Sequence, residues 1–281
     1  GPRDRRRPPV ALHEALPRAL AMKGHGLIGI TVLLLGACMS RLFWGVCLLV
    51  LASGCARPST PDNTFRFEGA LPKDFGLRAQ ARYALPEGCE ARYWDLIQEF
   101  EVPLEQGAPA YRFDIPVHYP VGGCQARLVR VGLRIDGRYG PLKWQEISAL
   151  GNLRVVEQLP TGAPSFDAAG VLHKQAHCGW WFQLSSAASR RGEISKLLNC
   201  PGAGAHLPAN GLVGKTVRLD VALDREEEPY REPYWHRVPN GWKPCTGRWG
   251  TPREELCLKP PQFMPFKMNG RTCTVYPSCT E

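Results

Sequence analysis

Cysteine is the residue type whose chemistry dominates this sequence. The chain has 281 residues and 11 cysteines, and eight of these follow residue 55: Cys89, Cys124, Cys178, Cys200, Cys245, Cys257, Cys273 and Cys279. An even number of cysteines in an exported chain indicates a disulfide framework. Zinc binding is the alternative, but it needs close pairs such as C-x2-C, and none occurs among these eight. We therefore expect disulfides and no metal site.

The positions of the cysteines along the chain predict how they pair. Cys89–Cys124 and Cys178–Cys200 are expected from their proximity and from the pairing of neighbouring strands, with two further bridges among the last four cysteines. The Cys178–Cys200 bridge would stabilise the fold by about 3 kcal/mol, because it reduces the conformational entropy of the unfolded chain.

Familiar catalytic patterns are missing from the sequence, which has no G-x-S-x-G, H-E-x-x-H, P-loop or G-x-G-x-x-G motif. His173 and His177 have a spacing that would hold a metal on a helix, but the surrounding residues lead into a strand, so we interpret them as a solvated loop. Ser185 and Ser186 are better explained as polar residues at a strand end than as nucleophiles. We predict a protein that is not an enzyme and has no cofactor, with an envelope hydrolase as the least favoured alternative.

Two stretches near the carboxyl end have the composition of a protein-binding surface. The default interpretation of the acidic run Glu226, Glu227 and Glu228 is a solvated turn, and the functional one is a patch that steers a basic partner. The second stretch mixes arginine and lysine with aromatic rings, the residue types that dominate binding hot spots. Its candidate binding residues are Tyr234, Trp235, Trp242 and Trp249. The competing interpretation is that these rings cover a poorly packed tail.

Residues 22–55 have the order of a secretory signal. Arg41 precedes an apolar run over residues 42–52, which is followed by two small residues and Cys55. This run is too short for a membrane span, which needs about 20 residues. Leu51–Cys55 resembles the lipobox of bacterial lipoproteins. The resemblance implies cleavage before Cys55, acylation of its thiol and, because Ala56 rather than Asp follows, anchoring in the inner leaflet of the outer membrane.

A second lipobox-like sequence ends at Cys38, so translation could start at Met22 or at Met39. We favour Cys55 as the lipidated residue, because a polar tether follows it and a second apolar run follows Cys38. Residues 1–21 are interpreted as an upstream, non-native segment, with a basic disordered arm as the alternative.

The net charge of +9 is concentrated in the leader. Residues 1–55 contain seven of the 35 basic and two of the 26 acidic side chains, which leaves 28 basic and 24 acidic ones, a net charge of +4. This balance removes the main argument for a nucleic-acid partner.

Alternation of apolar and polar residues predicts strands over residues 77–83, 126–135, 153–159, 179–184, 194–198 and 216–223. Residues 92–102 fit either a strand, which we favour, or a short helix. Residues 111–119 fit an edge strand because Pro116 cannot donate a hydrogen bond, and a turn is expected over residues 136–140. With 26 prolines and 29 glycines as breaks, the fold class is all-β, a β-sandwich of short antiparallel strands with long loops.

These observations divide the chain into five segments. They are an upstream segment (1–21), a signal region (22–55), a tether (56–65), the β-sandwich (66–224) and a Cys-, Trp- and Pro-rich extension (225–281). The extension has little regular structure in this interpretation, so its cysteines would hold it in place, either as a small subdomain or as an arm on the sandwich.

Two stretches, 124–140 and 178–200, are similar to periplasmic immunity lipoproteins encoded beside type VI secretion phospholipase effectors. The first joins Cys124 to an arginine-rich strand, and the second joins Cys178-Gly-Trp-Trp to Leu198-Asn-Cys200. The resemblance implies a lipid-anchored protein that binds a secreted phospholipase toxin and blocks its active site. The alternative is an envelope-structural lipoprotein that binds peptidoglycan or an outer-membrane complex.

Overall fold

The computed structural model describes residues 62–104, 109–246, 251–252, 255–258 and 261–280. The predicted lipidation site, Cys55, and the predicted binding residue Trp249 lie outside the described residues. The described residues all belong to one compact unit.

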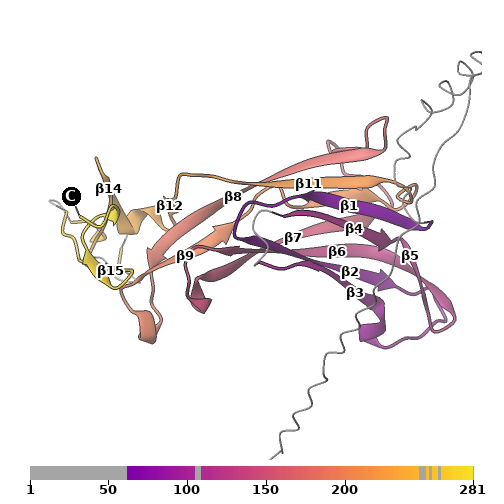
Figure 1. The fold of residues 1–281 in the computed structure, drawn as a ribbon, viewed down its shortest axis with the longest axis horizontal. Helices are drawn as coiled ribbons and strands as arrows, with labels where there is room; N and C mark the ends of the chain where they lie inside the picture. Colours follow the sequence, from indigo (N-terminus) through magenta and orange to yellow (C-terminus); the bar gives the residue numbers. More distant parts are fainter. Residues whose placement is uncertain (1–61, 105–108, 247–250, 253–254, 259–260, 281) are drawn as a thin grey trace, which may run out of the picture. The chain divides into compact units, whose positions relative to one another are not determined.

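The first sheet has six strands in the order β12-β8-β11-β1-β4, with β9 also paired with β8 (Figure 1). Its members are β1 (Thr64–Ala70), β4 (Ala110–Pro116), β8 (Val171–Leu184), β9 (Ile194–Asn199), β11 (Thr216–Leu223) and β12 (Glu228–Pro229). Strand β11 is parallel to both β1 and β8. The first half of β8 pairs with β11, and its second half pairs with β9 and β12.

The second sheet also has six strands, in the order β10-β7-β6-β2-β3, with β5 paired with β6. Its members are β2 (Phe75–Ala84), β3 (Ile97–Val102), β5 (His118–Val121), β6 (Cys124–Arg138), β7 (Glu146–Val156) and β10 (Ala205–Pro208). Strands β3, β2, β6 and β7 are antiparallel neighbours, and β10 runs parallel to β7.

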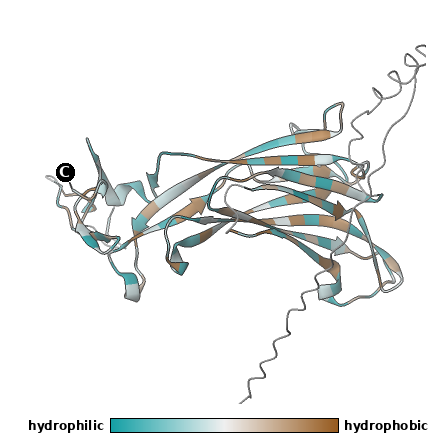
Figure 2. Ribbon diagram, in the orientation of Figure 1, coloured by the Kyte–Doolittle hydropathy of each residue, from teal (hydrophilic) through white to brown (hydrophobic). Residues whose placement is uncertain are grey.

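The apolar positions of both sheets form one core. Phe65, Phe67 and Leu219 from the first sheet and Leu133 and Ile135 from the second are almost fully buried members of the same hydrophobic cluster. Brown and teal residues alternate along the strands in Figure 2, as expected where successive side chains point to opposite faces. The predicted all-β sandwich is confirmed.

The strand pairing and lengths differ from the prediction. Both sheets are mixed rather than wholly antiparallel, and β6 and β8 are long, with 15 and 14 residues. The sandwich begins with β1 at Thr64, inside the segment predicted as a tether, because Phe65 and Phe67 are buried while Arg66 and Glu68 alternate with them.

The predicted edge strand over residues 111–119 is two strands. Strand β4 is the last strand of the first sheet, as expected of a strand that ends in Pro116. After Val117, the chain continues in the second sheet as β5, which pairs with β6. The ambiguous segment 92–102 is a 3-10 helix, η1 (Tyr93–Leu96), followed by β3.

The turn predicted over residues 136–140 lies further along the chain, because β6 continues to Arg138. Gly137 is a packing residue rather than a turn residue: a Cβ atom there would lie 3.0 Å from the Trp180 ring and 3.1 Å from Leu198. The loop predicted around His173 and His177 is the first half of β8.

The carboxyl-terminal residues form a second, smaller core that includes the ends of β8 and β9. We call this part, from Glu228 onward with those two strand ends, the C-terminal head (Figure 1). Its strands are β13 (Trp235–Val238), β14 (Gly241–Pro244), β15 (Phe266–Met268), β16 (Arg271–Cys273) and β17 (Tyr276–Pro277). The remaining 3-10 helices are η2 (Lys143–Gln145), η3 (Ala188–Arg190) and η4 (Glu232–Tyr234). The described part of the predicted extension thus has a buried cluster of its own.

Candidate functional site in the C-terminal head

Phe182, at the end of β8, is the centre of the core of the head. Its ring is fully buried and lies 4.9 Å from the ring of Trp235 and 4.2 Å from that of Tyr276. Trp235 is only 6% exposed and also packs against Phe266. The ring of Trp235 thus packs in the core of the head, and its predicted contact with a partner stays a prediction.

Glu227 is likewise an internal residue. Its Oε1 forms an ion pair with Lys196 Nζ on β9 at 2.6 Å, and its Oε2 accepts a hydrogen bond from the hydroxyl of Tyr276. The side chains of Lys196 and Glu227 are 16% and 24% exposed. The carboxylate of Glu227 thus connects the segment after β11 with strands β9 and β17, and its predicted role in docking a partner stays a prediction.

Aromatic rings enclose the ammonium group of this ion pair. Lys196 Nζ lies 5.4 Å from the centre of the Tyr139 ring and 5.8 Å from that of Tyr276. Burial, and then the nearby Glu227 carboxylate, raise the pKa of Tyr276 well above its usual value. Burial also raises the pKa of Tyr139. Both phenols therefore stay protonated at neutral pH and act as hydrogen-bonding groups.

The other predicted binding residues occupy different positions. Glu226 and Glu228 are exposed, so the remainder of the acidic run faces solvent. Tyr234 and Trp242 are partly buried and pack against the core of the head. Gly241, before Trp242, has a φ of 138°, and a Cβ atom there would lie 1.9 Å from the carbonyl oxygen of Tyr276, so glycine allows β14 to approach β17.

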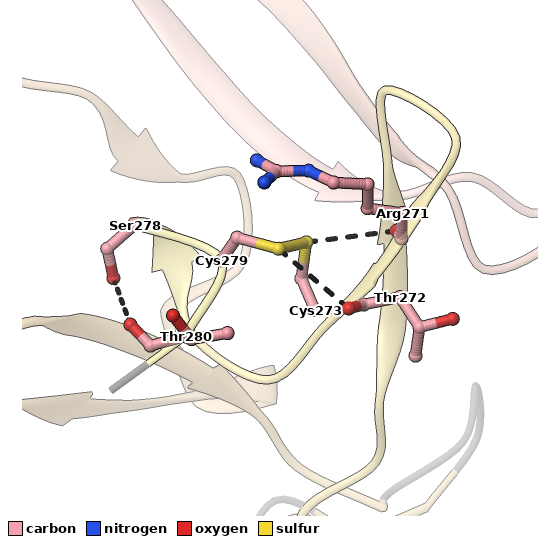
Figure 3. The surroundings of a disulfide bond; sticks show 6 residues. All are labelled: Arg271, Thr272, Cys273, Ser278, Cys279 and Thr280. Atoms are coloured by element: carbon pink, nitrogen blue, oxygen red, sulfur yellow. Dashed lines mark hydrogen bonds between the residues drawn. A yellow bond between two sulfur atoms is a disulfide. The ribbon is translucent and has the colours of Figure 1, made fainter.

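Four disulfides join the eight cysteines of the described chain in the predicted pattern: Cys89–Cys124, Cys178–Cys200, Cys245–Cys257 and Cys273–Cys279. The last two bridges lie in the head. Figure 3 shows Cys273–Cys279, with the sulfur atoms 3.8 Å from the carbonyl oxygens of Arg271 and Thr272. These bridges indicate that the protein folds in an oxidising compartment of the extracellular or periplasmic type.

The larger of two cavities at the head lies between the turn after β6, strand β9 and the hairpin of β15 and β16. Its volume is about 860 Å³. The residues that give it chemical character are Tyr139, Trp144, Lys196, Lys267, Arg271 and Tyr276. The Lys196–Glu227 ion pair lies at its wall, so the lining combines rings with fixed charges.

The second cavity, of about 320 Å³, lies beside η4 and is lined by Tyr230, Tyr234, Trp235 and Met264 among others. Trp235 thus lies between the core of the head and this cavity. The surrounding residues give the cavity a mainly aromatic and apolar lining, which suits a protruding apolar side chain.

Cationic side chains lie over aromatic rings at and near the two cavities: Trp144 lines the larger one, and Tyr230 and Arg231 line the smaller one. The guanidinium group of Arg190 lies 4.8 Å from the Trp144 ring centre, and that of Arg237 lies 4.9 Å from Trp242. Two further pairs, at 5.4 and 5.6 Å, are Lys243 with Phe263 and Arg231 with Tyr230. Tyr230 and Phe263 are 40% and 37% exposed. Cation–aromatic pairs at a surface offer rigid contact area to a partner.

Sequence reasoning missed Tyr139, Trp144, Arg190 and Lys196 as parts of this site. They precede the predicted extension by 29 residues or more. No spacing pattern connects them to it, because the pairing of β8 with β9 brings them together with the head. The predicted aromatic stretch 230–249 does contribute Tyr230, Tyr234 and Trp242 to the same region.

The two histidines considered as metal ligands lie on β8, and each is close to one carboxylate. His173 Nε2 is 3.5 Å from Asp167, and His177 Nδ1 is 3.8 Å from Asp224. Among the described residues there is no group of three or more histidine, cysteine or carboxylate side chains that could hold a metal ion.

In the part of the chain that the structure describes, no helix has the length and apolar character needed to cross a bilayer. No protein-family model matches the chain, and no curated protein or solved structure matches it either.

Proposed function

We propose that this is an exported, lipid-anchored binding protein that neutralises a membrane-acting toxin, of the secreted phospholipase class, by covering the toxin's active site. The observation that carries the proposal is a set of cation–aromatic pairs at the disulfide-held head, two of which, Arg190–Trp144 and Arg231–Tyr230, lie at the edges of the two cavities. Aromatic and arginine side chains that enclose hollows are typical of binding hot spots.

The rigidity of the head supports binding by shape. Two disulfides and the Lys196–Glu227 ion pair hold the loops that surround the cavities. A surface that is already ordered loses little conformational entropy when a partner docks, so more of the contact energy contributes to affinity. Occlusion requires only such a surface and no catalytic group on the inhibitor.

The lipid anchor supports the same function. Acylation of Cys55 in the periplasm would keep the protein at the membrane that a phospholipase attacks, which raises its local concentration around the toxin. Replacing Cys55 with serine should release the protein into the soluble periplasmic fraction and reduce protection of the cell, while the affinity of the purified protein for the toxin stays unchanged.

The decisive experiment measures binding of the purified, disulfide-bonded protein to the phospholipase-like products of neighbouring genes, together with inhibition of vesicle hydrolysis. Replacing Trp144, Tyr230 or Phe263 with alanine should weaken binding about tenfold or more, as expected of hot-spot residues. Val213→Ala is the control, because Val213 is 45% exposed and lies outside the head. Absence of binding to every such product, or equal affinity in all four variants, would contradict the proposal.

The exposed rings also support a second candidate, an envelope-structural lipoprotein that binds peptidoglycan. Tyr230 and Phe263 present ring faces that can stack on sugars. Sedimentation with purified cell wall, lost in Tyr230→Ala and Phe263→Ala, would favour this function over toxin binding. Trp235 is unsuitable for that test because its replacement would disrupt the core of the head.

A further inference from the structure

A row of basic side chains crosses the outer face of the second sheet. Arg82 on β2 lies opposite Arg130 on β6, Arg130 lies opposite Arg154 on β7, and Arg154 pairs with His206 on β10. Each of the four has a buried neighbour in its own strand (Ala81, Val131, Leu153 and Leu207), so the four side chains share the face that points away from the core. We call Arg82, Arg130, Arg154 and His206 the arginine row.

Such an arrangement opposes folding. Like charges directly opposite each other on neighbouring strands repel, and they occur here at two consecutive strand pairs. Among the described residues, Arg130 and Arg154 have no carboxylate partner, and Arg82 donates a hydrogen bond from Nε to the neutral Gln80 at 2.9 Å. The positive charge of the row is therefore not compensated within the described part of the chain.

A depression of about 420 Å³ lies beside the row. Four guanidinium groups line it, those of Arg78, Arg82, Arg130 and Arg134, against one carboxylate, Glu99. Gly132, between Arg130 and Arg134 on β6, also lines the depression, and a Cβ atom there would meet nothing closer than 3.9 Å. Glycine inside a strand marks a place where a ligand can approach the backbone closely.

Arg78 adds a second indication. Its Nε atom is buried and has no hydrogen-bond partner among the described residues, although its terminal nitrogen contacts Glu101 at 3.2 Å. A buried N–H group without a partner is costly, and rotation of the Arg78 side chain toward an acceptor on a bound ligand would remove that cost.

We propose that this face binds an anion that carries two phosphate groups, held between Arg82, Arg130 and Arg154 over the hollow at Gly132. The planar guanidinium group matches phosphate oxygens with two parallel hydrogen bonds. Neighbouring strands are about 4.8 Å apart, so each of two phosphates can lie between two adjacent arginines. A phosphate monoester carries a charge of about −1.5 to −2, so two of them balance the row.

Titration calorimetry with pyrophosphate tests the proposal on the purified, disulfide-bonded protein. We expect pyrophosphate to bind at least tenfold more tightly than inorganic phosphate. Arg130→Gln and Arg154→Gln should each weaken pyrophosphate binding about tenfold and, because they relieve repulsion, raise the melting temperature of the free protein. Gly132→Val should leave the melting temperature nearly unchanged and abolish binding, because its side chain fills the hollow.

Arg112→Gln is the matched control, because Arg112 is an exposed arginine on the first sheet. Equal pyrophosphate affinity in the wild type, Arg130→Gln and Gly132→Val would overturn the proposal. Tighter binding of poly-glutamate than of pyrophosphate would also overturn it, because that result assigns the face to an acidic protein.

Vesicle sedimentation distinguishes the two sources of phosphate. In a Cys55→Ser background, binding to vesicles with phosphatidylglycerol but not to pure phosphatidylcholine, lost in Arg130→Gln, supports the site with adjacent lipid headgroups as the ligand. Binding to pyrophosphate without binding to vesicles supports it with a soluble ligand. Binding to neither overturns it. The toxin-binding test uses Trp144, Tyr230 and Phe263, none of which belongs to the arginine row or lines its depression, so the two proposals can fail independently.

Discussion

Lys196 and Glu227 form an ion pair, with Nζ and Oε1 2.6 Å apart, that connects the sandwich strand β9 to the start of the C-terminal head. The two residues are 31 positions apart in the sequence. Because Tyr276 donates to the same carboxylate, one side chain joins three segments of the chain.

We predict that Glu227→Gln lowers the free energy of unfolding by about 1–3 kcal/mol, because it leaves a mostly buried ammonium group without its counter-charge. Urea unfolding at pH 7 measures the change. The control is Asp95→Asn, which breaks the pair of Asp95 with Arg92, a residue that is 82% exposed, and should change stability by less than about 0.5 kcal/mol. Equal effects of the two substitutions would show that the buried pair contributes nothing.

Trp235→Ala is predicted to act on stability rather than on recognition. Removing a ring that is 6% exposed from the core of the head should cost about 3–5 kcal/mol, whereas Tyr230→Ala, at 40% exposed, should cost less than about 1 kcal/mol. Limited proteolysis should cut the head of the Trp235→Ala protein and leave the Tyr230→Ala protein intact. A stable Trp235→Ala protein that loses only partner binding would restore the interpretation of Trp235 as a contact residue.

The four bridges should differ in their contributions. Cys178–Cys200 has a sequence separation of 22 and should contribute roughly 3 kcal/mol, while Cys273–Cys279, with a separation of 6, should contribute about 2 kcal/mol. Paired replacement of each by alanine, followed by urea unfolding, gives the two values. A larger loss for the short loop would indicate that packing of Cys273, which is fully buried, outweighs chain entropy.

The sequence predicted those parts of the fold in which local pattern decides the structure. Strand β11 has the bounds expected from its alternation, and the cysteine pairs follow from their order along the chain. The first half of β8 was missed because its buried positions include the small residues Ala176 and Cys178, which give a weak apolar signal. The parallel pairing of β11 with β1 and β8 depends on contacts that are distant in sequence, and alternation alone carries no information about direction.

The site was predicted less well, for a related reason. An aromatic-rich stretch looks the same in the sequence whether it forms a core or a binding surface. The buried Trp235 and the exposed Tyr230 could therefore not be distinguished before the position of Phe182 was known. A carboxylate in an acidic run is expected to be exposed unless a basic side chain pairs with it. Lys196 can pair with Glu227 only because β9 runs antiparallel beside β8.

Alkaline pH should destabilise the protein through its buried phenols. Burial raises the pKa of Tyr83, Tyr111 and Tyr276 in the folded state, whereas an unfolded tyrosine titrates near pH 10. A raised folded-state pKa means that the stabilisation is complete below pH 10 and is lost as the pH rises, because only the unfolded chain then releases these protons. The free energy of unfolding should therefore fall above pH 10 by about 1.4 kcal/mol per pH unit for each such tyrosine.

Tyr111→Phe tests this linkage at one residue. Tyr111 is 4% exposed and donates a hydrogen bond to the carbonyl oxygen of Leu219 at 2.8 Å, so the substitution should cost about 1 kcal/mol at pH 7. It should also reduce the fall in the free energy of unfolding between pH 10 and pH 11 by the amount that one buried tyrosine contributes. Urea unfolding at several pH values, with Tyr93→Phe as the exposed control, measures both quantities. An unchanged slope in Tyr111→Phe would mean that the hydroxyl of Tyr111 ionises in the folded protein as readily as in the unfolded chain, despite its burial against β11.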